Sequence, residues 1–327
     1  MQFIIIIIII LKVRCSLTLN IHTDKPGAGF TKLFRPVYSM RRERVFRDRS
    51  NLLEIYNNED FISQFRLPKV AILSLTDELA EVLSPATSRS HCIPAVLQVC
   101  TALRFYATGT FLNAVGDTVG LSKASVSWVV YRVSRALSNK LPQFPNQMAE
   151  VNKLKRGFFS IARFLNVVGA IDGKHVRIQA PTAHEHLFVN RKGYHSLNIQ
   201  AVCDSDLRFL NSFEQGIIDG VLLGDSGYPL KPWLLTPFLN PTTPAQRNYN
   251  IAHCSTHNTV ERAFGVVKRR FHCLHGELRM APDRVCNIIC ATVVLHNIAS
   301  QFRTVYAVGL APCRAEGERD DVDDGVA

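Results

Sequence analysis

Apolar residues recur every three or four positions through the first half of the chain, as in "DFISQFRLPKVAILSLTDELAEVL" from Asp60. That spacing is typical of amphipathic helices, because residues three and four apart share one face. Thr76, followed by two acidic residues, has the pattern of a helix start. Similar spacing continues from Ile93 to Leu141, and no strand-like alternation appears before about residue 165. The first half is therefore predicted to be helical.

One part of this half has the pattern of two helices joined by a short turn, in "FLNAVGDTVGLSKASVSWVVYRVSRAL". Gly120 marks the turn, and Ser122 is the expected N-cap of the second helix. Such a pair is the sequence form of a helix-turn-helix, whose second helix can enter the DNA major groove. Lys123 and Arg132 on that helix are then candidate nucleic-acid contacts. An ordinary helical hairpin is the alternative.

After Arg163 the pattern changes to short apolar runs bounded by Gly, Pro and Asp, which are typical of strands. These runs are "FLNVVGAIDGKHVRIQAP", "HSLNIQAVCDSDLRFL" and "GVLLGDSG". Two helical patterns follow, in "STHNTVERAFGVVKRRFHCL" and "DRVCNIICATVVLHNIASQF". We therefore predict an α/β domain over residues 160–304, preceded by a helical domain over residues 41–150.

Composition limits the class of protein. With 327 residues, 47% of them hydrophobic, the chain can form about two globular domains. The formal charge of +11 favours polyanionic partners, and nine cysteines without CxxC pairs favour a reducing compartment. The apolar run from Phe3 to Leu11 is too short to span a membrane. Residues 1–40 are expected to be low-complexity and disordered, and residues 305–327 to be a disordered acidic tail.

Two aspartates follow apolar runs in the second half: Asp172 in "VVGAIDGKHV" and Asp225 in "GVLLGDSGY". Strands that end this way can place both carboxylates at one sheet edge, where hard oxygen ligands suit Mg²⁺ or Mn²⁺. Glu261 is the third candidate, because it flanks the apolar face of a helix, and Gly265 one turn on would let that helix approach closely. The apolar face comprises Val260, Phe264, Val267 and Phe271.

Three such carboxylates could hold two divalent ions for in-line attack on a phosphodiester. The alternative is that Asp172 and Asp225 are turn residues and Glu261 is a solvated helix charge. Basic residues nearby are candidate contacts for a phosphate backbone. They lie in "VNRKGYHSLN" and at the end of the helix that carries Glu261, and comprise Arg191, Lys192, Lys268, Arg269 and Arg270. A solvated turn is the alternative for the first pair.

Several motifs, in order, resemble the PIF/Harbinger transposases and the host nuclease derived from them. They are "RSHCIPAVLQVCTALRFYATGTF", "VVGAIDGKHVRIQAP", "FVNRKGYHSLNIQAVCD", "LLGDSGYPLKPWLLTPF", "YNIAHCSTHNTVERAFGVVKRRF" and "VLHNIA". The resemblance implies an RNase H-like domain with a DDE carboxylate triad, carried by "AIDG" onto Asp172, by "LLGDSGYPL" onto Asp225 and by "VERAFG" onto Glu261. It also implies a divalent metal cofactor, DNA as substrate, a Myb/SANT-like DNA-binding partner and a nuclear location. No membrane association is expected, since the apolar run from Phe3 is too short.

The chain departs from the family pattern after "VCDSDLRFLN". At Asn211 and Ser212 it passes directly to "SFEQGIIDGVLLGD", so the rest of one strand and a helix that covers the sheet are absent. This apparent internal deletion predicts exposed apolar surface and a misplaced Asp225, and small displacements of catalytic groups lower rates strongly. Two functions stay open: a metal-dependent DNA endonuclease, or a degenerate or domesticated copy that binds DNA or protein without cutting.

Overall fold

The computed structural model of the protein describes residues 7–8, 51–84, 92–145, 147–210 and 219–302. The helices are α1 (Leu52–Ile55), α2 (Asn58–Phe65), α3 (Lys69–Leu83), α4 (Ala95–Thr108), α5 (Leu112–Val119), α6 (Lys123–Ser138), α7 (Met148–Ala162), α8 (Pro244–Arg270) and α9 (Pro282–Gln301), with short 3₁₀ helices η1 (Glu185–Leu187) and η2 (His272–Leu274). The strands are β1 (Ile7–Ile8), β2 (Val167–Arg177), β3 (Ser196–Cys203), β4 (Phe209–Leu210), β5 (Val221–Leu223) and β6 (Leu234–Leu235). The predicted deletion point at 211–212 and the predicted tail at 305–327 lie outside the described residues. Of residues 1–40, expected to be disordered, the pair forming β1 is described.

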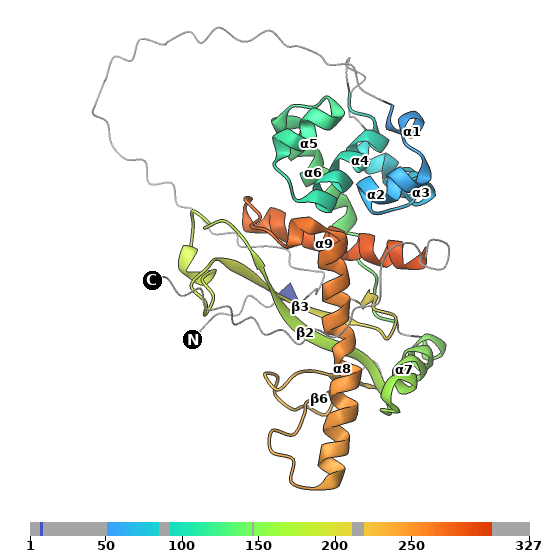
Figure 1. The fold of residues 1–327 in the computed structure, drawn as a ribbon, viewed down its shortest axis with the longest axis vertical. Coiled ribbons are helices and arrows are strands. Elements are labelled where there is room, and N and C mark those ends of the chain that lie inside the picture. Colours follow the sequence, from blue (N-terminus) through green and yellow to red (C-terminus); the bar gives the residue numbers. More distant parts are fainter. Residues whose placement is uncertain (1–6, 9–50, 85–91, 146, 211–218, 303–327) are drawn as a thin grey trace, which may run out of the picture.

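The strands form one mixed sheet in the order β1-β3-β2-β5-β6, with β4 paired to β3. β2 runs antiparallel to β3 and parallel to β5, and helices pack on the sheet (Figure 1). The predicted α/β class is confirmed. The prediction that a strand ends at Asp172 is wrong, because the pairing of β2 with β3 continues past it to Arg177. Asp172 is a mid-strand residue opposite Ala201.

Both faces of the sheet are packed against helices. On one face, Ala170 and Leu223 belong to a buried cluster that includes apolar residues of α8 and α9. On the other face, Val168 and Leu222 are buried with Leu154 of α7. The sequence predicts exposed apolar surface where a covering helix is absent. Among the described residues, α7 packs on this face of the sheet.

The described residues from 51 to 162 contain helices and no strand. Gly120 ends α5 with a φ of 68°, a backbone conformation that favours glycine, and the Ser122 side chain accepts a hydrogen bond from the Ser125 N–H at the start of α6. The predicted turn at Gly120 and the predicted cap at Ser122 are confirmed, and both fit a helix-turn-helix as well as an ordinary helical hairpin. The predicted helix start at Thr76 is wrong, because the apolar spacing before it already belongs to α3. The Thr76 hydroxyl lies inside the helix and donates to the Ile72 carbonyl.

The helical half and the α/β half share one continuous buried cluster, with α9 between the α1–α6 bundle and the sheet (Figure 1). Arg284 of α9 donates to Ser127 Oγ at 3.3 Å and lies 4.9 Å from the Tyr131 ring, both on α6. Gly109, which ends α4 with a φ of 65°, lies so close to η2 that an added Cβ would be 2.9 Å from Cys273 Cα. The two predicted domains are therefore in direct contact.

The turn between β3 and β4 is organised by Asp204, whose carboxylate accepts hydrogen bonds from the Asp206 and Arg208 N–H groups at 2.9 and 2.7 Å. Burial raises the pKa of Asp204 from its ordinary 3.8 to about 6. The folded protein therefore binds this proton more tightly than the unfolded chain does, so stability contributed by the protonated form is lost as the pH rises from about 4 to 6.

Asp204→Asn is expected to remove this pH dependence, because an amide does not titrate in this range. The amide oxygen can still accept both backbone hydrogen bonds, so the turn should be kept. The difference in free energy of unfolding, variant minus wild type, should therefore rise by about 2–3 kcal/mol from pH 4 to pH 7. Urea unfolding at several pH values measures the difference. Asp283→Asn, at an exposed aspartate on α9, is the control. If the difference in free energy of unfolding between variant and wild type stayed constant across this range, the raised pKa of Asp204 would be contradicted.

Candidate metal centre

The register of two parallel strands places Asp172 and Asp225 at the same level of the sheet. Ala170 of β2 pairs with Leu223 of β5, and each aspartate lies two residues further along its chain. Neighbouring strands are about 4.8 Å apart, and residues two apart in a strand point to the same face. Ala170 and Leu223 both belong to the buried cluster that includes α8. Asp172 therefore lies on the α8 side of β2, and Asp225 lies in the turn just after the end of β5. The register gives no sign of the predicted displacement of Asp225.

Each carboxylate has local hydrogen-bond donors. Asp172, 8% exposed, accepts the Gly173 N–H at 2.7 Å, and its Oδ2 lies 3.9 Å from Lys174 Nζ. Asp225 is exposed and accepts the Gly227 N–H at 3.0 Å. The two side chains are therefore held by a strand and by a tight turn, and Lys174 partly offsets the charge of the buried one.

Tyr228 lies close to both aspartates, a placement that the sequence pattern did not predict. Gln200 Nε2 donates to its phenol oxygen at 2.6 Å. Burial, with smaller contributions from the charges of Asp172 and Asp225, raises the pKa of Tyr228 to about 12. The phenol therefore stays protonated at neutral pH and remains a hydrogen-bond donor beside the carboxylates. The only sequence signal for it is its place in the turn that follows Asp225.

Glu261 is exposed on α8. The predicted apolar face of this helix is confirmed, since Val260, Val267 and Phe271 are buried and Phe264 is half-buried. Within the described part of the chain, no three His, Cys, Asp or Glu side chains are grouped so that they could hold a metal ion. The structure thus aligns the two aspartates, but does not join Glu261 to them as one metal-binding cluster.

Gly265 does not have the predicted role. An added Cβ at this position would meet no atom within 4 Å, so packing of α8 does not require a glycine here, and the prediction of close approach is wrong. The helix already packs through the buried residues on its adjacent face.

Gly265→Ala is therefore expected to raise the free energy of unfolding by about 0.5–1 kcal/mol, the gain in helix propensity. Gly116→Ala is the matched control on α5, because its Cβ would lie 2.3 Å from the Leu121 carbonyl oxygen and should destabilise the protein. Thermal and urea unfolding compare the two variants. Destabilisation by Gly265→Ala would show that α8 packs more closely than described.

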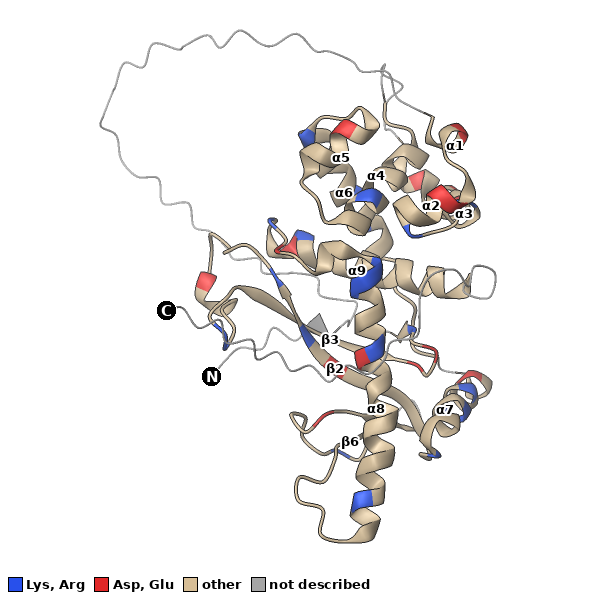
Figure 2. Cartoon of the chain, viewed as in Figure 1, with Lys and Arg blue, Asp and Glu red and all other residues tan. Residues whose placement is uncertain are grey.

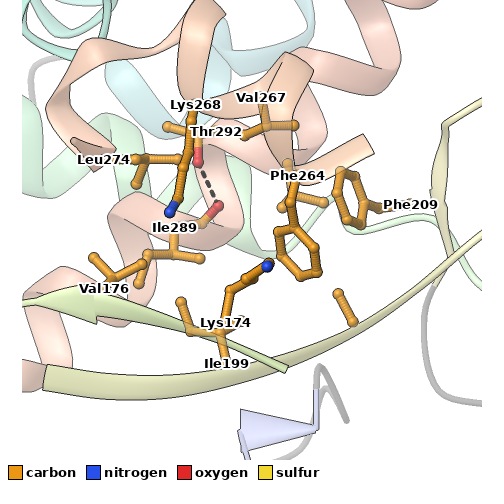
Figure 3. A pocket seen from close by; sticks show the side chains of 12 residues that line it. Lys174, Val176, Ile199, Phe209, Phe264, Val267, Lys268, Leu274, Ile289 and Thr292 are labelled. Carbon is orange, nitrogen blue, oxygen red and sulfur yellow. Dashed lines mark hydrogen bonds between the residues drawn. The ribbon is translucent and has the colours of Figure 1, made fainter. Parts of the chain in front are cut away.

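Two lysines reach a pocket between the sheet and helices α8 and α9. Lys174 extends from β2 and Lys268 from α8, and both point into the pocket (Figure 3). Its walls are otherwise mostly apolar and include Val176, Phe209 and Phe264. Positive charge therefore lies within reach of Asp172 on the α8 side of the sheet.

The other predicted nucleic-acid contacts are distributed over several elements. Arg191 and Lys192 are exposed in the loop before β3, and Arg269 is exposed at the end of α8. Basic positions appear on α8 and on the neighbouring strands in Figure 2. Arg270, by contrast, bonds to the buried His296 through its guanidinium. The predicted group therefore divides into exposed cations and one that supports packing of α8 on α9.

On α6, Lys123 is exposed at the start of the helix. Arg132 lies 4.6 Å from the Trp128 ring and donates to the Val82 carbonyl. Its guanidinium is thus engaged within the helical half. DNA contact by this helix stays a prediction.

The described helices include none with the length and hydrophobicity that a membrane span requires.

The second half of the chain matches a family model described as DDE superfamily endonuclease, in two segments, 171–217 and 212–297. The chain is 38% identical over 276 residues to the Homo sapiens protein named "Putative nuclease HARBI1", covering 76% of this chain and 79% of that protein. It is 34% identical over 278 residues to the Xenopus laevis protein of the same name, covering 76% and 80%. "Protein ALP1-like" of Arabidopsis thaliana is 27% identical over 242 residues, covering 62% and 59%. No solved structure matched.

Proposed function

Because the chain belongs to the Harbinger transposase-derived family of DDE superfamily endonucleases, we propose that it is a divalent-metal-dependent endonuclease that hydrolyses phosphodiester bonds of DNA. The observation that supports the proposal is the pairing of β2 with β5, whose register puts Asp172 and the turn that carries Asp225 at the same level of the sheet. An RNase H-like arrangement of the catalytic half fits both the mixed sheet and the family.

The donor set has the chemistry that Mg²⁺ and Mn²⁺ prefer, since carboxylate oxygens are hard ligands. Asp172 and Asp225 would hold the metal from adjacent strands, and Glu261 would complete the site from α8, where its exposed side chain has room to turn. When bound, the metal would activate the attacking water and stabilise the leaving oxygen. Two ligands of the proposed site would thus come from the sheet and the third from α8.

Basic and hydroxyl side chains around these carboxylates would bind and orient the substrate. Lys268 and the exposed Arg269 lie further along the helix that carries Glu261, where a phosphate backbone would meet positive charge. Arg191 and Lys192 would extend that contact over the loop before β3, and Lys123 would do so from the helix-turn-helix. The protonated phenol of Tyr228 could donate a hydrogen bond to a phosphate oxygen. These contacts are largely independent of sequence, because they address the backbone of DNA.

DNA as substrate also supports a nuclear location, and the family resemblance supports a Myb/SANT-like DNA-binding protein as partner. We therefore extend the proposal to a nuclear location and to a DNA-binding protein partner. A direct binding measurement between the chain and such a protein would test the second point.

A plasmid assay tests the proposed activity. Purified chain incubated with supercoiled DNA is expected to produce nicked circles with Mg²⁺ or Mn²⁺ and none with excess EDTA. Binding of the same DNA should be measured in parallel by gel shift. Persistent binding without nicking would favour the second function, a non-catalytic DNA- or protein-binding copy. That function is favoured by the absence of a three-ligand cluster among the described residues.

A further inference from the structure

Two buried histidines precede Glu261 along one side of α8. His253, His257 and Glu261 are spaced by four residues, so they follow one stripe of the helix. His253 is 3% exposed and His257 is 7% exposed. Their rings are nearly parallel, with 15° between the planes and 5.8 Å between the centroids. The stripe thus runs from two buried imidazoles to the exposed carboxylate.

His257 connects this stripe to the strand of the first aspartate. Its Nε2 lies 3.0 Å from the carbonyl oxygen of Ile171, the residue immediately before Asp172. A carbonyl can only accept a hydrogen bond, so the imidazole must donate from Nε2. Because Ile171 is paired within the sheet through Val202, this acceptor cannot move without disturbing the pairing of β2. The hydrogen bond therefore fixes the distance between α8 and the backbone at Asp172.

His253 makes the equivalent connection to the second aspartate. Its Nε2 lies 3.2 Å from the Leu235 carbonyl oxygen. The same oxygen accepts the N–H of Gly224 at 3.0 Å, and Gly224 immediately precedes Asp225. The rings of Phe164 and His253 meet edge-on, with 6.3 Å between their centroids, and this contact limits the orientations of the imidazole. One carbonyl therefore links the helix to the residue that delivers Asp225.

We propose that His253 and His257 are positioning residues, which set the spacing between Glu261 and the two aspartates. Each imidazole joins α8 to the backbone next to one aspartate. These contacts hold the helix at Glu261, which lies one turn beyond His257 and two turns beyond His253. The inference rests on the proposed metal-dependent function. It assigns these side chains a role beyond filling the core, because their hydrogen bonds end beside the two aspartates of the site.

His296 on α9 provides a matched control. It is 1% exposed, its Nε2 lies 2.8 Å from the Leu207 carbonyl oxygen, and its Nδ1 lies 3.0 Å from Nη1 of Arg270 on α8. It therefore makes the same kind of buried hydrogen bond and also contacts α8, but its hydrogen bonds do not end beside Asp172 or Asp225. Phenylalanine in place of any of the three histidines keeps the aromatic bulk and removes the donor. Glutamine keeps a donor at a similar reach, so His257→Gln is the conservative variant.

The test is Mn²⁺ affinity of the full chain, measured by electron paramagnetic resonance titration, together with urea unfolding of each variant. His257→Phe and His253→Phe are expected to weaken Mn²⁺ binding about 10- to 100-fold, the range seen when groups that orient metal ligands are removed. His257→Gln should recover most of the affinity. His296→Phe should lower stability and leave the Mn²⁺ affinity unchanged. Asp172→Asn is included to test the metal site itself.

Wild-type affinity in His257→Phe would overturn the positioning role, and so would an equal loss in His296→Phe, because the effect would then be structural. If these histidine variants bind normally while Asp172→Asn loses Mn²⁺, the inference fails and the proposed metal site stands. If Asp172→Asn binds Mn²⁺ as the wild type does, or if the wild type binds none, the proposed function fails and the inference fails with it.

Discussion

Glu261→Gln is expected to reduce Mn²⁺-dependent nicking of supercoiled plasmid by about 10³-fold, the upper range for losing one group that stabilises charge in a transition state. The substitution keeps the size of the side chain and removes the negative charge that a metal ligand supplies. Glu261 is exposed on α8, so the fold should tolerate the change. DNA binding should persist, because the basic residues that would contact phosphates are untouched.

Glu277→Gln is the matched control for this experiment. Glu277 is a partly exposed carboxylate that pairs with Arg279 at 3.3 Å and belongs to none of the elements that carry the site. The Glu277→Gln variant should nick plasmid DNA at the same rate as the wild type. Undiminished nicking by Glu261→Gln would remove this residue from the active site, and the two aspartates would then need another partner.

Phe271→Ala is expected to lower the free energy of unfolding by about 3–5 kcal/mol, the usual loss for truncating a buried phenylalanine. The side chain is fully buried at the end of α8, and it belongs to the cluster that joins this helix to the sheet and to the helical half. Since small domains have only about 5–15 kcal/mol of stability, such a loss is a large share of the total.

Ile251→Ala, on the same helix but 65% exposed, is the control for this prediction. It should change stability by less than about 0.5 kcal/mol, as is usual for surface sites. Urea unfolding followed by circular dichroism gives both values. Similar losses in the two variants would mean that α8 is not anchored through its apolar face.

Local patterns in the sequence predicted much of the fold, because they follow from interactions between near neighbours. The spacing of Val260, Val267 and Phe271 identified the buried face of α8, and Ser122 identified the start of α6 through a cap formed within one turn. The two errors had different causes, one within a helix and one from a strand distant in the sequence. Thr76 is inside α3 because an earlier apolar run continues the helix, and Asp172 is mid-strand because β3 extends the pairing.

The candidate site was predictable only in its carboxylates. Asp172 and Asp225 each follow an apolar run, which is a local signal, and the strand register then aligns them. Tyr228 and the two histidines of α8 carry no such signal, since their roles depend on acceptors and charges that come from other parts of the sheet. Gly265 shows the opposite case. A glycine suggests close packing in a sequence, and only the structure reveals that the space beside it is open.

Anomalous diffraction from crystals grown with Mn²⁺ tests the central claim most directly. The account predicts a manganese peak between the carboxylates of Asp172 and Asp225, with Glu261 turned toward it from α8. Crystals of the Asp225→Asn variant, grown with Mn²⁺ in the same way, should lack that peak. A manganese peak elsewhere, or none at these carboxylates in a well-ordered crystal, would contradict the claim that this family member retains a metal centre.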